Sequence, residues 1–83
     1  MDRQKYNTQF QIIDQSGIIR SDCAGITFIN TSLIDTITIN TFPIKPGASL
    51  SIDANENELD TTVYQVKLGT DPNTLWVIKK IYL

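Results

Sequence analysis

The residues whose spacing could support chemistry lie in one acidic stretch, from Asp53 to Asp60. It begins with oxygen-bearing side chains at its first, third and fifth positions, as an EF-hand calcium loop does. The pattern then fails, because Glu58 stands where glycine is required and Tyr64 stands where a bidentate glutamate is required. We favour a solvated turn between two strands. The alternative is an irregular calcium site built from four side chains: Asp53, Asn55, Glu58 and Asp60.

Catalysis by paired carboxylates would have to use the same stretch, through Glu56, Glu58 and Asp60. Such a pair works when burial or a cleft separates the two pKa values, and the polar surroundings predict exposure instead. The sequence contains no histidine, so Cys23 lacks its usual activating base. It also contains no glycine-rich phosphate loop and no G-x-S-x-G turn. We therefore expect no enzyme activity, no bound metal and no cofactor.

The composition indicates a small domain with a modest core. Eighty-three residues, of which 41% are hydrophobic, are enough for one domain. The lone cysteine, Cys23, excludes an intrachain disulfide, and one thiolate with carboxylates is not a usual zinc site. Self-association is the remaining way for so small a domain to gain stability. We expect a homo-oligomer, either a dimer or a trimer.

The charge pattern predicts neither a nucleic-acid partner nor a membrane partner. The net charge is −2, and among the seven basic residues only Lys79 and Lys80 are adjacent, whereas nucleic-acid binding requires basic clusters. No apolar run approaches the ~20 residues of a membrane span. The polar start, from Met1 to Lys5, is unlike a signal peptide. We expect a protein that is made in the cytoplasm.

Short alternating segments, separated by turn residues, predict the fold class. We expect a polar N-terminal arm over residues 1–9 and a single β domain over residues 10–83. No segment has helical periodicity. The sequence therefore predicts an all-β protein, a small antiparallel β-sandwich or jelly-roll-like domain of about seven or eight short strands. Strict alternation within the clearest strands predicts the core, which should contain Ile37, Ile39, Leu50, Ile52, Tyr64 and Val66.

Residues 75–83 form a predicted strand that is mostly apolar on both faces. Two arrangements explain this pattern: the strand is central and covered on both sides, or one face packs on another subunit. The candidate subunit interface comprises four residues: Trp76, Ile78, Tyr82 and Leu83. A sugar-stacking platform made of aromatic side chains is a less favoured alternative, because their spacing does not single out one face.

The second half of the sequence resembles a known class of proteins. A strand, the Pro46-Gly47 turn and an acidic loop lead into Glu58-Leu59-Asp60-Thr61-Thr62-Val63-Tyr64, and the closing strand reads Leu75-Trp76-Val77-Ile78-Lys79-Lys80-Ile81-Tyr82. This order of elements, over residues 35–83, is similar to small virion structural proteins of tailed bacteriophages that infect Bacteroidetes-type hosts. The first thirty residues take no part in the resemblance.

The resemblance implies a role in a phage particle. It implies a virion structural protein of the head fibre or capsid decoration type, located in the virion, although a tail or baseplate component is also compatible. Such a protein would assemble with itself and with other virion proteins such as the major capsid protein. A carbohydrate- or receptor-binding β module is the alternative function, and a small hydrolase is disfavoured by the missing histidine.

Overall fold

The computed structural model describes residues 5–55, 58–69 and 74–82, and every regular element in these ranges is a β-strand. The expected all-β class is therefore confirmed. The eight strands are β1 (Tyr6–Ile13), β2 (Gly17–Arg20), β3 (Gly25–Asn30), β4 (Ile37–Ile39), β5 (Phe42–Ile44), β6 (Ser49–Asp53), β7 (Val63–Lys67) and β8 (Leu75–Tyr82). A search of the described residues found no helix that could cross a membrane.

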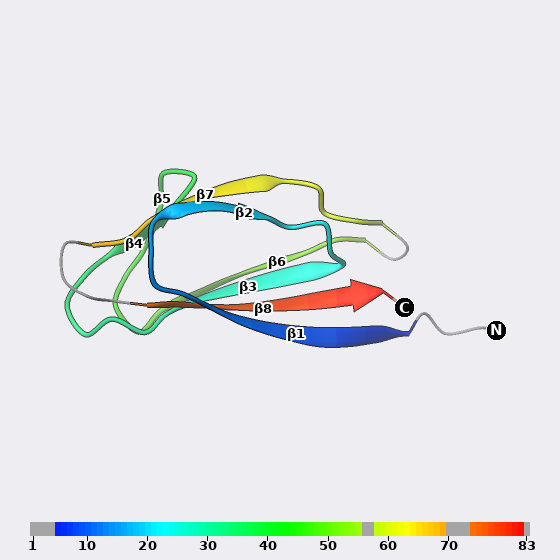
Figure 1. The fold of residues 1–83 in the computed structure, drawn as a ribbon, viewed down its shortest axis with the longest axis horizontal. Helices are drawn as coiled ribbons and strands as arrows, with labels where there is room; N and C mark the ends of the chain where they lie inside the picture. The colour runs from blue at the N-terminus through cyan, green and yellow to red at the C-terminus, as the bar shows by residue number, and fades with distance from the viewer. Residues whose placement is uncertain (1–4, 56–57, 70–73, 83) are drawn as a thin grey trace.

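The strands form two antiparallel sheets that pack as a sandwich (Figure 1). One sheet has the order β1-β8-β3-β6 and the other has the order β2-β7-β4-β5. The first strand pairs with the last, and the pairing continues inward as β2 with β7, β3 with β6 and β4 with β5. A long antiparallel ribbon that folds over on itself in this way has the strand order of a jelly roll.

The core lies between the two sheets and follows the predicted alternation. All six predicted core residues are there: Ile37, Ile39, Tyr64 and Val66 are buried, and Leu50 and Ile52 are half-buried against the same cluster. Phe28 of β3 meets Tyr64 of β7 edge-on, with ring centroids 5.1 Å apart. This aromatic contact ties one sheet to the other, because the two strands belong to different sheets.

Residues 6–9, expected to belong to the N-terminal arm, are instead part of β1, which begins at Tyr6. Tyr6 and the three residues after it pair in continuous register with the end of β8, from Tyr82 to Lys79. The sequence suggested an arm because this stretch is polar. Its polarity has another cause: β1 is an edge strand whose side chains are exposed on both faces as far as Ile12.

A tight turn at Asn40 and Thr41 connects β4 to β5. Both residues have positive φ, 50° and 71°, which is the pattern of a type I′ hairpin turn. The Asn40 amide nitrogen donates to the Gln65 carbonyl oxygen at 2.9 Å, and the Asn40 Oδ1 accepts from the Gln65 amide at 2.7 Å. These two bonds fix the hairpin against β7.

The sandwich is elongated, with extents of 48 × 18 × 17 Å. Because β1 and β8 are antiparallel and Tyr6 is paired with Tyr82, the described ends of the chain lie side by side at one end of the molecule (Figure 1). The loop between β3 and β4 lies at the opposite end (Figure 1). That loop carries Leu33, which is 93% exposed.

Candidate interaction surface

The register of the first sheet brings together apolar side chains from three strands. Phe10 of β1 lies opposite Ile78 of β8, and Ile12 lies opposite Trp76. Trp76 in turn lies opposite Ile29 of β3. Since paired residues in a sheet share a face, all five side chains lie on one face, which we call the apolar patch.

The apolar patch lies on the outer face of its sheet, the face turned away from the second sheet. The neighbouring residues of β8, Leu75 and Val77, point to the inner face and are buried. Phe10, Ile12 and Trp76 are 74%, 64% and 48% exposed. Contiguous exposed apolar surface of this kind marks interaction sites in soluble proteins.

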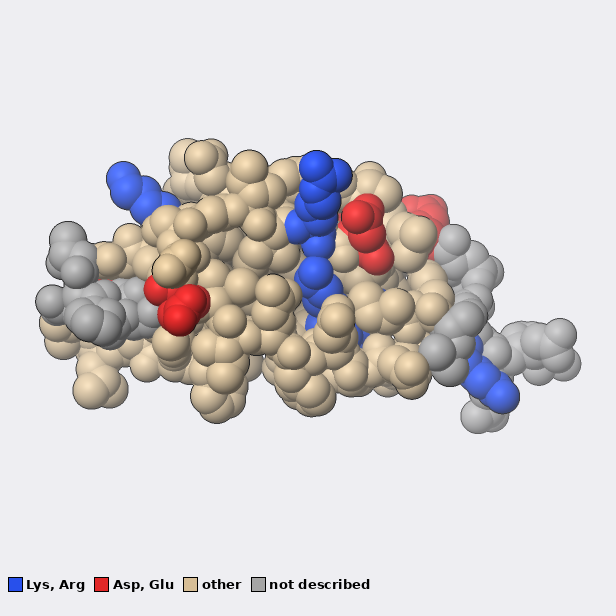
Figure 2. Space-filling view, viewed as in Figure 1, with Lys and Arg blue, Asp and Glu red and all other residues tan. Residues whose placement is uncertain are grey.

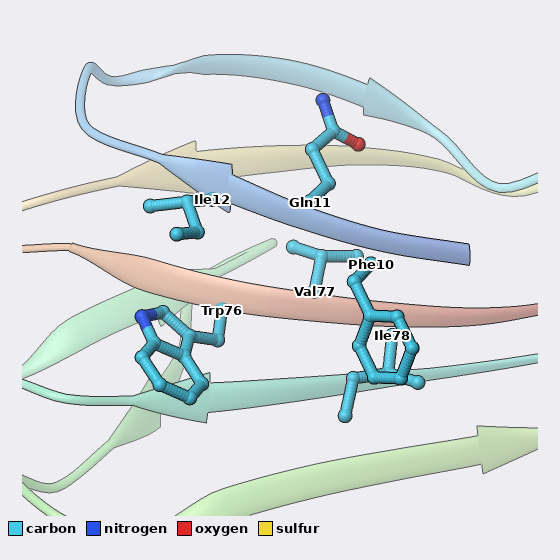
Figure 3. A pocket seen from close by; sticks show the side chains of 6 residues that line it. All are labelled: Phe10, Gln11, Ile12, Trp76, Val77 and Ile78. Atoms are coloured by element: carbon cyan, nitrogen blue, oxygen red, sulfur yellow. The ribbon is translucent and has the colours of Figure 1, made fainter. Parts of the chain in front are cut away.

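A hollow of about 400 Å³ lies within the apolar patch on β1 and β8. Figure 3 shows the side chains of Trp76, Phe10 and Ile78 on one side of these strands and Gln11 directed to the other side. The hollow is therefore lined by hydrocarbon and aromatic rings on the side that faces solvent. Such a lining suits an apolar side chain of a partner better than a polar ligand.

The outer face becomes polar toward the chain ends. Lys80 of β8 lies opposite Gly25 of β3, and Gly25 lies opposite Asp53 of β6. The Lys80 Nζ sits 5.6 Å from the centre of the Tyr6 ring, a cation–π distance. A Cβ on Gly25 would lie 2.7 Å from the Asp53 Oδ1, so a glycine at this position leaves room for the carboxylate.

Charged side chains are sparse on the side of the molecule shown in Figure 2. Lys and Arg atoms form a narrow column near the middle of this view, with smaller groups toward either end, and Asp and Glu atoms lie in a few small groups (Figure 2). Neither sign of charge covers a broad area of this view.

Two of the four predicted interface residues, Trp76 and Ile78, belong to the apolar patch. Tyr82 lies on the same face but beyond Lys80, opposite Tyr6. Leu83 lies outside the described residues. One of the two arrangements considered for β8 is wrong: the strand is central in its sheet, but the described chain does not cover its outer face, since Trp76 is about half exposed.

The sequence-based list missed Phe10 and Ile12, which complete the apolar patch. Their spacing of two already placed them on one face of a strand. What the spacing could not show is that the chain's first strand pairs with its last. That pairing is what sets Phe10 and Ile12 beside Ile78 and Trp76.

A second group of polar residues surrounds Asp60, which is only partly exposed. The Ser21 Oγ donates to the Asp60 Oδ2 at 3.0 Å, and the Tyr64 hydroxyl donates to the same oxygen at 2.6 Å. The Thr62 amide donates to the Asp60 Oδ1 at 3.0 Å. The backbones of Asp60 and Cys23 also pair as an isolated bridge. We expected this end of the acidic stretch to be solvated, and for Asp60 that expectation is wrong.

These contacts set the protonation of the cluster. Burial alone would raise the pKa of Asp60, but the hydrogen bonds from Thr62, Tyr64 and Ser21 outweigh burial and lower the pKa to about 2. Burial and the bond to Asp60 raise the pKa of Tyr64 to about 12. A carboxylate with so low a pKa is a poor general base near neutral pH. The cluster is therefore better suited to fixing the loop than to moving protons.

Metal and thiol chemistry find little support in the described part of the chain. Within it, no three acidic, cysteine or histidine side chains come together as metal ligands. Glu56 and Asn57 of the acidic stretch lie outside the described residues. Cys23 is fully buried, and its Sγ donates to the Gly25 carbonyl oxygen at 3.1 Å. A thiol in this setting is shielded from reagents.

No protein-family model, curated protein or solved structure matches this chain.

Proposed function

We propose that this chain is a non-enzymatic structural protein of a bacteriophage particle, of the head fibre or capsid decoration type. In this proposal it assembles with itself and with other particle proteins through the apolar patch. The observation that carries the assembly role is the exposure of Phe10, Ile12 and Trp76 around one apolar hollow. The assignment to a phage particle rests on the sequence resemblance over residues 35–83.

The strand order is compatible with this role. Jelly rolls occur in viral capsid domains and also in lectin domains. The fold is therefore compatible with both functions and does not decide between them. A sugar site would need hydrogen-bonding side chains beside its aromatic rings. Around the hollow, the side chains on the exposed side are Phe10, Ile12, Trp76 and Ile78, none of which accepts a hydrogen bond well. This composition favours a protein partner over a carbohydrate.

The first test replaces Trp76 with Glu. A carboxylate in the centre of the apolar patch should weaken association through the patch and leave each subunit folded, because Trp76 lies on the outer face and not in the core. Light scattering at micromolar concentration measures the association, and circular dichroism checks the fold. Leu33→Glu is the matched control, since Leu33 is equally apolar, is 93% exposed and lies outside the patch. If both variants associate as the unmodified protein does, the patch is not the assembly surface.

The second test addresses the particle. Mass spectrometry of purified virions should detect the chain in many copies, and its gene should lie among genes for portal, capsid or tail proteins. Absence from purified particles would reject the virion role while leaving the association surface to be judged by the Trp76→Glu result. Quenching of Trp76 fluorescence by a soluble glycan, in the absence of any protein partner, would instead support the carbohydrate-binding alternative.

A further inference from the structure

The four edge strands of the sandwich differ in how well they resist pairing with another chain. β2 is four residues long and contains Arg20, and β5 is three residues long and contains Pro43. β6 has five residues and ends at Asp53. Short length, charge and proline are the devices by which proteins protect sheet edges. Three of the four edges therefore carry such a device.

β1 carries none of them. It has eight residues, from Tyr6 to Ile13, without a charge, a proline or a glycine. Its register with β8 is continuous over all eight residues, so no bulge twists the edge away. Within the described chain, β8 is its only strand neighbour (Figure 1). β1 is thus a long, uncharged edge without a bulge, and it is open to strand addition.

The direction of the free backbone groups follows from the ladder. The Asn30 amide donates to the Ala48 carbonyl oxygen, and the Asn30 carbonyl oxygen accepts from the Gly47 amide, so the Asn30 backbone faces β6. Antiparallel strands alternate in this respect from one residue to the next. We followed this alternation through the paired residues of β3, β8 and β1. The backbone N–H and C=O groups of the odd-numbered residues of β1 point toward β8. The backbone groups that point away from β8 belong to the even-numbered residues, Tyr6, Thr8, Phe10 and Ile12.

We infer that β1 pairs with β1 of a second copy of this chain, antiparallel about a two-fold axis, and joins two four-stranded sheets into one of eight strands. A two-fold axis brings residues near it close to their own copies, so a charged edge would repel itself. With the axis at Gln9, Thr8 lies opposite Phe10 of the second copy, and Asn7 lies opposite Gln11. All of these residues are uncharged, and the amides can bond to one another.

This contact is separate from the apolar patch and does not rest on the phage role. A two-fold axis normal to the sheet keeps the outer faces of both copies on the same side. The two apolar patches would then lie on one continuous face, still available to a further partner. The edge and the patch can therefore be tested independently.

The test replaces Thr8 with Pro. Proline removes an amide that points away from β8, so the ladder within the chain is kept while pairing with a second copy is blocked. We expect self-association, measured by sedimentation velocity, to weaken at least about tenfold. Thr8→Val, which keeps both the amide and the β-branched shape, should associate like the unmodified protein. Circular dichroism establishes that each variant is folded.

Amide hydrogen exchange provides a readout that needs no variant. The outward amides of Thr8, Phe10 and Ile12 should exchange quickly in dilute solution and become protected as concentration rises, whereas the amides of Gln9 and Gln11 should be protected throughout. The inference is overturned if the protein stays monomeric to about 1 mM. It is equally overturned if the outward amides remain unprotected in the oligomer, or if Thr8→Pro associates as tightly as the unmodified protein while Trp76→Glu does not.

Discussion

Asp60 holds the corner between β2 and β3 against the loop that precedes β7, and its contacts make stability depend on pH. The ordinary pKa of 3.8 applies to the unfolded chain, whereas the folded value is about 2. Above about pH 4 the carboxylate is ionised in both states and stabilises the fold fully. As the pH falls from 4 toward 2, the unfolded chain takes up the proton first, so this contribution is lost.

Asp60→Asn should remove the contribution. At pH 7 we expect the variant to be less stable by about 2 kcal/mol, because hydrogen bonds to a charged acceptor are weakened. The difference from the unmodified protein should shrink as the pH approaches 2. Urea unfolding at several pH values measures both free energies. Equal losses of stability at pH 7 and pH 2 in this variant would show that the charge of Asp60 does not matter.

The core offers a direct comparison between burial and exposure. Ile39 is 2% exposed in the centre of the sandwich, and Ile39→Ala should destabilise the fold by about 2–4 kcal/mol through lost contacts and a cavity. Leu33→Ala removes a side chain of similar size at the exposed loop and should change stability by less than about 0.5 kcal/mol. Thermal unfolding of both variants measures the contrast, and similar losses for the two would place Ile39 outside the core.

The contacts of Asp60 could not be predicted from the neighbouring residues in the sequence. Its neighbours in the sequence are polar, which predicted a solvated loop. The partner that helps to bury it, Ser21, is 39 residues away. Backbone pairing of Asp60 with Cys23 and of Thr62 with Ser21 brings the two segments together.

At the scale of elements, the hairpin between β4 and β5 stores strain in a residue poorly suited to its turn. Thr41 has φ of 71°, a conformation that β-branched residues rarely adopt. Thr41→Gly should therefore stabilise the protein by about 1 kcal/mol, since glycine adopts positive φ without a steric penalty. Thr38→Gly, in β4 itself, should be destabilising by a similar amount. Urea unfolding measures the free energy of unfolding of both variants. A loss of stability in Thr41→Gly would mean that the threonine side chain stabilises the turn by more than its backbone strain destabilises it.

The sequence predicted the individual strands better than their partners. Alternation at Ile37 and Ile39 identified both the strand and its buried face, because a side-chain period of two is a local property. The start of β1 was missed for the opposite reason. Tyr6 to Gln9 are held by β8, at the far end of the chain, and no local pattern carries that information.

At the scale of the whole molecule, the same reasoning explains why the fold class could be predicted but the strand order could not. Many short alternating segments are typical of sandwiches, jelly rolls and barrels alike. The choice among them depends on pairings between distant strands, of which β1 with β8 is the extreme case. Only part of the candidate surface was predicted, for the same reason. Trp76 and Ile78 lie within one strand, whereas Phe10 and Ile12 join the apolar patch only because β1 pairs with β8.

The closeness of Tyr6 and Tyr82 has a practical consequence for handling this protein. An affinity tag or a biotin linker attached at either terminus would anchor the sandwich by the same end. On a coated sensor chip, both attachments would present the Leu33 loop and the Trp76 end of β8 toward the solution. The two orientations of fusion should therefore give the same binding curve for a partner of the apolar patch. The coating density would also set the distance between immobilised copies. Binding of other proteins could then be measured separately from self-pairing.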